Sequence, residues 1–189
     1  MNYVDVLNQI LDSGNTTVGG GSSAALAGAM ACGLISMVCK LSTKKDFGIS
    51  PEDQLKYAAE LDEIQKELLE GSVKDVEAYT TIVNAYKLPK ETEEEKEIRK
   101  KAISDAGVVG ATTPMENGYR NKRVLEIANI LKGNTNPATN SDFEVGMDLA
   151  KIGIKGCIMN IEANTPIIKD EEELKKFDHA IEELQSILN

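Results

Sequence analysis

Apolar residues recur every three or four positions along almost the whole chain, which is the spacing of an amphipathic helix. This periodicity predicts helices over residues 2–11, from the glycines at 19–21 to about 42, and over 50–88, 92–131, 141–164 and 170–188. No segment alternates with the period of two that marks a strand, and there is neither an internal repeat nor a linker. The sequence therefore predicts one all-α domain, residues 1–189, in which long helices surround a central helix of small residues.

Several helix ends carry capping signals. Ser50 followed by Pro51 favours a helix start, and Thr92 with Glu95 three residues later forms a capping box. Asp170 precedes the last helix in a similar way. Pro114 is expected either to kink the fourth helix or to begin a new one.

The most unusual stretch runs from Gly19-Gly20-Gly21-Ser22 into a series of alanines, with no charge before Lys40. Ser22 or Ser23 is the expected N-cap, and free N–H groups at such a helix start attract anions. The apolar part, roughly residues 24–39, falls short of the roughly 20 residues that span a bilayer, so we expect a buried core helix rather than a membrane segment. The glycine loop is expected to form one wall of a binding site.

Asp75 interrupts the apolar stripe of the third helix, which contains Leu61, Leu68, Tyr79, Ile82 and Tyr86. A carboxylate in that position should face neighbouring residues, and a charge that is buried needs a specific partner. Two interpretations remain open: a functional acid, or a structural Asp that either caps another helix or is exposed because the stripe rotates around the helix.

One face of the segment 141–164 combines glycines with polar residues. Gly146, Gly153 and Gly156 indicate close approach by another element, and Asn160 and Asn164 need hydrogen-bond partners there. These asparagines serve either a ligand or a bridge between helices.

Composition narrows the function. The net charge is −10, so a nucleic-acid or anionic-membrane surface is not expected. The three cysteines show no metal-ligand spacing and are odd in number, which favours buried thiols in a reducing compartment. Without a basic and then apolar N-terminus, no signal peptide is expected, and the predicted location is the cytoplasm.

The available side chains favour acid–base chemistry. The single histidine, His179, lies off the apolar stripe of its helix, so mechanisms that need a catalytic histidine are not expected, and no cluster favours a metal. Asp75 and Asp142 are candidates for proton transfer. A polar heterocycle could be bound by the asparagines Asn134, Asn160 and Asn164. An anionic tail could be bound by the lysines Lys44, Lys45 and Lys90.

The order of these motifs resembles the cyclodeaminase part of formiminotransferase-cyclodeaminase and the related bacterial methenyltetrahydrofolate cyclohydrolases. The resemblance covers nearly the whole chain and rests on the following stretches: Gly19-Gly20-Gly21-Ser22, Lys44-Lys45-Asp46-Phe47, Asp75-Val76-Glu77-Ala78-Tyr79, Leu88-Pro89-Lys90, Pro114, Gly133-Asn134, Ser141-Asp142 and Asn160-Ile161-Glu162-Ala163-Asn164. Each motif is weak alone, and the ordered set is specific.

The resemblance implies an all-α homodimer that acts on a one-carbon tetrahydrofolate, with no cofactor beyond that substrate. Cyclohydrolase chemistry would convert 5,10-methenyltetrahydrofolate and water to 10-formyltetrahydrofolate. Cyclodeaminase chemistry would convert 5-formiminotetrahydrofolate to the methenyl compound and ammonia. A folate-binding helical dimer without turnover is the alternative from another class.

The resemblance also assigns roles to residues. Asp75 and Asp142 would transfer protons, and Gly19, Gly20, Gly21 and Ser22 would line the pocket. The pterin or the one-carbon unit would be bound by the asparagines Asn134, Asn160 and Asn164. Lys44 and Lys45 would face the glutamate tail.

Overall fold

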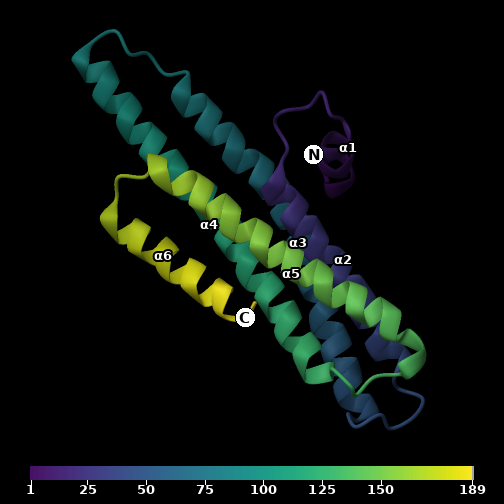
Figure 1. Cartoon of the computed structure of the whole chain (residues 1–189). Coiled ribbons are helices and arrows are strands. Elements are labelled where there is room, and N and C mark those ends of the chain that lie inside the picture. Colours follow the sequence, from purple (N-terminus) through teal and green to yellow (C-terminus); the bar gives the residue numbers. More distant parts are fainter. Residues whose placement is uncertain (189) are drawn as a thin grey trace.

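The protein is a bundle of long helices, seen here in a computed structural model that describes residues 1–188 (Figure 1). The elements are α1 (Tyr3–Leu11), α2 (Gly20–Leu41), α3 (Pro51–Tyr86), α4 (Glu93–Leu131), α5 (Asn140–Asn164) and α6 (Glu171–Ser186), with short 3₁₀ turns at Pro137–Thr139 and Thr165–Ile167. No strand occurs within these residues, which confirms the predicted all-α class.

Most helix ends follow the local signals in the sequence. Ser50 caps α3 through the N–H of Asp53, and Thr92 and Glu95 form the expected capping box at α4. Asp170 accepts hydrogen bonds from two N–H groups at the start of α6. Two predicted starts were wrong: α2 has Gly19 as N-cap, not Ser22 or Ser23, and α5 begins at Asn140, before Ser141.

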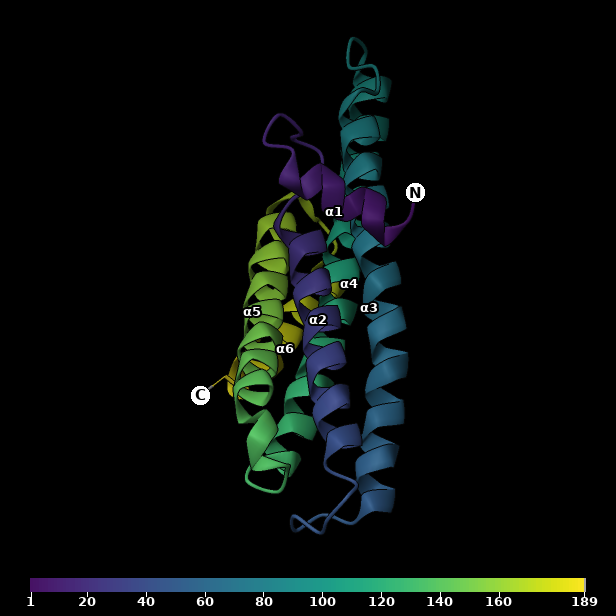
Figure 2. The ribbon, with the colours of Figure 1, turned by 90° about the vertical axis from the view of Figure 1, so that its right-hand side faces the viewer.

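The centre of the bundle is α2, which packs between α3 and α5 with α4 behind it (Figure 2). Small residues allow this close packing: an added Cβ at Gly28 would meet the side chain of Asn121, and one at Gly156 of α5 would lie 2.7 Å from Ala24 Cβ. Helix α2 is long and apolar enough to span a membrane, but 67% of its most apolar stretch of 18 residues is buried within the bundle. The expected core helix is therefore confirmed, although it is longer than its apolar stretch indicated.

The predicted apolar stripes are only partly buried. Leu61 and Leu68 of α3 are fully buried, whereas Tyr79 and Tyr86 are 43% and 47% exposed because α3 and α4 extend beyond the N-terminus of α2 (Figure 2). In α1, which lies across α2 and α3, Val6 is buried and Ile10 packs partly against the same apolar cluster. The other apolar residues at helical spacing, Val4, Leu7 and Leu11, are exposed. The predicted C-terminal stripe is confirmed, with Phe177 and Leu184 inaccessible to solvent.

Helix α4 is continuous through Pro114, so the proline does not begin a new helix. Proline has no N–H for the carbonyl four residues earlier, which belongs to Gly110. The side-chain amide of Asn164 donates to that carbonyl at 3.0 Å and replaces the missing hydrogen bond. This interaction joins α4 to the end of α5.

Candidate functional site

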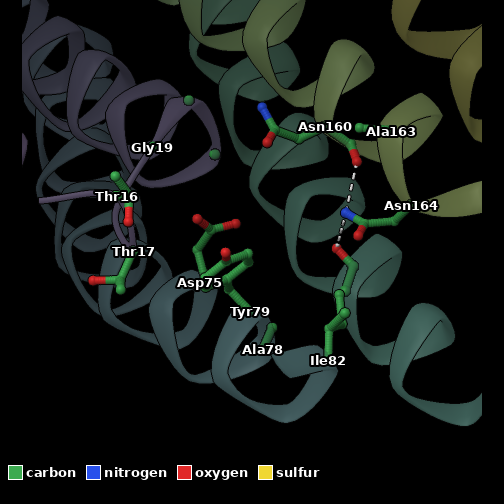
Figure 3. A pocket seen from close by; sticks show the side chains of 13 residues that line it. Thr16, Thr17, Gly19, Asp75, Ala78, Tyr79, Ile82, Asn160, Ala163 and Asn164 are labelled. Atoms are coloured by element: carbon green, nitrogen blue, oxygen red, sulfur yellow. Dashed lines mark hydrogen bonds between the residues drawn. The ribbon is translucent and has the colours of Figure 1, made fainter. Parts of the chain in front are cut away.

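A cavity of about 280 Å³ lies at the N-terminus of α2. Because α2 begins there, the cavity lies between α3 and α5, and Gly110 of α4 completes its lining (Figure 3). The lining comes from the loop before α2 and from four helices, and consists of Thr16, Thr17, Gly19, Gly20, Gly21, Asp75, Ala78, Tyr79, Ile82, Gly110, Asn160, Ala163 and Asn164.

Asp75 reaches from α3 to the first turn of α2. Its Oδ2 accepts a hydrogen bond from Ser22 Oγ at 2.9 Å, and the backbone N–H of Ser22 also donates to the carboxylate. Ser22 Oγ is also 3.0 Å from the carbonyl oxygen of Ser72. Asp75 therefore caps α2 from a neighbouring helix, and among residues 1–188 it is also the one carboxyl group that lines the cavity.

Burial raises the pKa of the Asp75 carboxyl above its ordinary value, and the two hydrogen bonds from Ser22 oppose that rise. A carboxylate that is partly desolvated and held by fixed donors is suited to accept a proton and return it. The two interpretations of Asp75, a helix cap and a functional acid, are thus compatible in the same side chain.

The three glycines of the entrance have different surroundings. An added Cβ at Gly19 would meet nothing within 4 Å, and one at Gly20 would lie 3.2 Å from Asn160 Nδ2. An added Cβ at Gly21 would lie 2.7 Å from both Cγ and Oδ2 of Asp75 and closer still to Oδ1. The absence of a side chain at Gly21 is therefore what allows the carboxylate to reach α2.

Asn160 and Asn164 form the opposite wall, on the last turns of α5 (Figure 3). Their amide nitrogens donate to backbone carbonyls: Asn160 to Gly156 at 2.7 Å, and Asn164 to Asn160 at 2.8 Å as well as to Gly110. These bonds fix both side chains and leave their carbonyl oxygens as acceptors. Asn164 therefore bridges two helices, as one interpretation predicted, and also lines the cavity where a ligand could bind, as the other predicted.

The structure brings together Asp75, Gly19, Gly20, Gly21, Asn160 and Asn164, with Ser22 directly behind Asp75. The remaining predicted residues are not there: Lys44, Lys45, Asn134 and Asp142 lie at the opposite end of the bundle, in the connector after α2 and around the start of α5. Asp142 precedes Asn160 by 18 residues of one helix, or about 27 Å. Asp75 and Asp142, both predicted to transfer protons, therefore do not meet within one chain.

Local structure explains part of this separation. Asp142 lies in the first turn of α5, where a negative charge interacts favourably with the helix dipole. The side chain of Asn134 packs against Gly48, whose φ is +101°. The backbone carbonyl oxygen of Asn134 accepts a hydrogen bond from Gln54 Nε2 at 2.9 Å. Both positions thus have structural roles at that end.

Sequence reasoning missed several lining residues. Thr16 and Thr17 precede the glycines directly, and Ala78, Tyr79 and Ile82 follow Asp75 by one and two helical turns. The spacing after Asp75 could have identified these three, because residues three, four and seven apart share a helix face. Gly110 carried no such signal.

The chain is similar to known proteins over most of its length. Residues 4–183 match the family model described as formiminotransferase-cyclodeaminase. A methenyltetrahydrofolate cyclohydrolase of Methylorubrum extorquens is 34% identical over 180 residues, 92% of this chain and 86% of the relative. A formimidoyltransferase-cyclodeaminase of Gallus gallus is 28% identical over 155 residues, which is 82% of this chain and 29% of that longer protein.

A solved structure gives the same result for the fold. The crystal structure of a formiminotetrahydrofolate cyclodeaminase from Thermotoga maritima superposes with a TM-score of 0.78 at 26% identity. The match covers 90% of this chain and 82% of the other.

Proposed function

Because the chain belongs to the formiminotransferase-cyclodeaminase family, we propose that it is an enzyme of one-carbon folate metabolism that acts as a methenyltetrahydrofolate cyclohydrolase. The observation that carries the proposal is Asp75, a partly desolvated carboxylate held at the glycine entrance of a small cavity. The relative with this activity in its name is similar over most of both chains.

Asp75 has a direct task in this reaction. Water adds to the methenyl carbon between N5 and N10 while the carboxylate accepts one of its protons. The C–N5 bond of the tetrahedral intermediate then breaks as Asp75 returns that proton to N5. The remaining hydroxyl proton leaves to solvent, and the product is 10-formyltetrahydrofolate. General acid–base catalysis of this kind contributes about 10²- to 10⁴-fold to a rate.

The cavity is suited to the reacting part of the substrate. At about 280 Å³ it is at the lower end of the range for small-molecule pockets. We therefore place the pterin ring and the one-carbon unit inside, with the carbonyl oxygens of Asn160 and Asn164 as acceptors for the ring N–H groups. The aminobenzoyl-glutamate tail extends over the rim. The lining supplies one carboxylate, amides and hydroxyls, so we propose no cofactor besides the folate.

Formiminotetrahydrofolate cyclodeaminase activity is the second candidate, and the similarity to the Thermotoga maritima structure favours it. Here N10 attacks the carbon of the protonated formimino group, which becomes an amino group on a tetrahedral carbon, and Asp75 accepts the N10 proton. Asp75 then passes this proton to the amino group, the C–N bond to that group breaks, and ammonia leaves together with formation of the methenyl cation. One carboxylate at one position serves both reactions, because both pass through a tetrahedral carbon between N5 and N10.

The test is to assay the purified chain with both substrates. Decay of methenyl absorbance faster than the uncatalysed rate supports the cyclohydrolase, and ammonia release from the formimino substrate supports the cyclodeaminase. Asp75→Asn should abolish the activity, while Asp105→Asn, which changes an exposed carboxylate paired with Lys101, should not. Binding of folate without either reaction would refute both proposals and leave the non-catalytic alternative.

We also propose that the enzyme is a cytoplasmic homodimer. The thiols of Cys32, Cys39 and Cys157 are free and buried, in agreement with a reducing compartment. Exposed apolar side chains on the outer faces of α2 and α5 provide a surface on which a second chain can pack.

A further inference from the structure

The hydroxyl group of Ser22 lies between two acceptors that compete for its single proton. Ser22 is fully buried in the first turn of α2, and its Oγ is 2.9 Å from Asp75 Oδ2 and 3.0 Å from the backbone carbonyl oxygen of Ser72. A serine hydroxyl has one hydrogen, so it donates to one of these oxygens at a time. Both acceptors belong to α3 and come from residues three positions apart, so rotation about the Cβ–Oγ bond of Ser22 is enough to exchange them.

The charge of Asp75 decides which acceptor the hydroxyl prefers. A hydrogen bond to an ionised carboxylate is stronger than one to a neutral group, so the hydroxyl donates to Asp75 while that residue is ionised. Protonation removes this advantage, and a proton on Oδ2 turns that oxygen into a donor. The Ser72 carbonyl is then the better partner. Because a buried hydroxyl without a partner is costly, the second acceptor keeps Ser22 hydrogen-bonded in both states of Asp75.

The backbone N–H of Ser22 acts differently, because it cannot turn away. It also donates to the Asp75 carboxylate, and a fixed donor of this kind favours the ionised form at all times. A group that must accept a proton and later return it is better served by a donor that follows its charge. Ser22 thus provides Asp75 with one fixed hydrogen bond and one that can move.

A second serine on α2 shows which other features the arrangement needs. Ser36 Oγ lies 2.6 Å from Asp62 Oδ1 and 3.3 Å from the carbonyl oxygen of Ala58, which are again two acceptors on α3. Asp62, however, is also paired with Lys40 Nζ at 2.7 Å. Although burial raises the pKa of Asp62, the hydrogen bonds from Lys40 and Ser36 bring it below its ordinary value. That carboxylate therefore stays ionised near neutral pH, and its serine has no reason to turn.

The surroundings of Asp75 contain no cation that would hold its charge in the same way. Among residues 1–188 it is the one charged residue that lines the cavity, into which it points (Figure 3). From α5, Cys157 lies close enough to sense the carboxylate, but burial and this charge both raise the pKa of its thiol, which stays neutral. On α3 itself, Tyr79 also lines the cavity, and Lys74 and Glu77 are exposed to solvent. Protonation of Asp75 therefore acts mainly on Ser22.

We propose that the Ser22 hydroxyl follows the charge of Asp75: it donates to the carboxylate while Asp75 is ionised, and it turns to the Ser72 carbonyl when Asp75 holds a proton. Ser22 keeps its own proton throughout, and no covalent bond changes. It is thus a positioning residue that stabilises each state of the acid in turn. The benefit to turnover rests on the proposed function, whereas the rotation itself does not.

NMR tests the rotation without any substrate. In the ¹³C-labelled wild type, the side-chain carboxyl resonance of Asp75 reports its protonation, and the backbone carbonyl resonance of Ser72 should titrate with the same midpoint as the hydroxyl turns. Ser22→Ala keeps the charge of Asp75 but has no hydroxyl, so most of the change at Ser72 should disappear. The Asp75 midpoint should also rise by about one pH unit, because the carboxylate loses a donor that favours its ionised form.

Two other buried serines provide matched controls. Ser72→Ala removes a hydroxyl that donates to the Leu69 carbonyl but keeps the backbone carbonyl at position 72. Ser36→Ala removes the other serine–aspartate hydrogen bond, at Asp62, about 20 Å along α3 from Asp75. Neither change should move the Asp75 midpoint.

Two results would overturn the rotation. One is a Ser72 carbonyl resonance that does not titrate with Asp75 in the wild type, and this measurement needs no variant. The other is a Ser22→Ala variant in which that resonance titrates as before, since the change would then come from the charge of Asp75 alone.

The pH dependence of kcat/KM connects the rotation with turnover. In Ser22→Ala the acid limb of the profile should move to higher pH by the same amount as the Asp75 midpoint, while Ser36→Ala should keep the wild-type profile. An acid limb that stays in place while the NMR midpoint moves refutes the role in turnover. A wild type that is inactive on both folates refutes the proposed function instead, and leaves the NMR result standing.

Discussion

Alanine substitutions at the three glycines of the entrance should have three different effects. In Gly21→Ala, the new Cβ would lie 2.7 Å from Cγ and Oδ2 of Asp75, so the carboxylate must retreat by about 0.7 Å to restore an ordinary contact of 3.4 Å, and further for Oδ1. That movement breaks its hydrogen bonds with Ser22 and displaces the group that transfers the proton. A misplacement of about 1 Å costs about 10²-fold in rate, so kcat should fall by about that factor.

The two neighbouring glycines provide the controls. In Gly19→Ala the new Cβ would have no atom within 4 Å, and the φ of residue 19 is negative. This variant should therefore retain activity within about twofold. Gly20→Ala comes within 3.2 Å of Asn160 and should have an intermediate effect, mainly on KM. Initial rates of methenyl decay, with circular dichroism to confirm folding, measure all three. A Gly21→Ala variant as active as Gly19→Ala would refute the role of Asp75, because both changes add the same methyl group at the start of α2.

Three further predictions concern titration and stability. Burial raises the pKa of Asp75, so the folded protein binds a proton there more readily than the unfolded chain does. The ionised carboxylate therefore lowers the free energy of unfolding at neutral pH. This destabilisation disappears as the pH falls through the raised pKa and the carboxylate is protonated. Asp75→Asn should therefore raise the Tm at neutral pH and leave it unchanged in acid, and a thermal melt that shows no gain at neutral pH contradicts this. Wild-type kcat/KM should fall in acid as the carboxylate is protonated. Burial raises the pKa of Cys32 and Cys39 to about 12, so a thiol reagent should label the native chain only after denaturant is added, and rapid native labelling would refute their burial. Leu184→Ala should lower the free energy of unfolding by about 2–5 kcal/mol in a urea titration, while Leu55→Ala, which is 52% exposed, should change it by less than about 0.5 kcal/mol.

The fold was predictable because most of its signals are local. Helical spacing, the capping box at Thr92 and the Ser50-Pro51 start each depend on residues within one or two turns, and the structure confirms them. The failures are non-local. Ser22 has the right side chain for an N-cap, but Asp75 caps the helix from 53 positions away. Pro114 looked like a break, but Asn164 replaces its missing hydrogen bond from another helix.

The site was only half predictable for a related reason. A sequence shows which helix a residue belongs to and which face it occupies, but not how far along the bundle it lies relative to residues of other helices. Asn160 and Asp142 occupy the same face of α5, yet one lies at the cavity and the other at the far end. Their separation along α5 could be read from the sequence, but only contacts such as Gly20 with Asn160 show which of the two lies level with the cavity.

The capping role of Asp75 implies that this carboxylate also contributes to substrate binding. The N-terminus of α2 carries about half a positive charge, and the methenyl substrate is itself a cation at the ring that would enter the cavity. With Asp75 ionised, the helix end and the carboxylate together present about half a negative charge; in Asp75→Asn the same cavity presents about half a positive charge. We therefore expect Asp75→Asn to weaken binding of 5,10-methenyltetrahydrofolate by about tenfold or more, while 10-formyltetrahydrofolate, which has no cationic ring, binds about as before. Fluorescence or calorimetric titration of the two compounds, which needs no turnover, measures the difference. Equal loss for both would mean that Asp75 acts through the shape of the cavity and not through its charge.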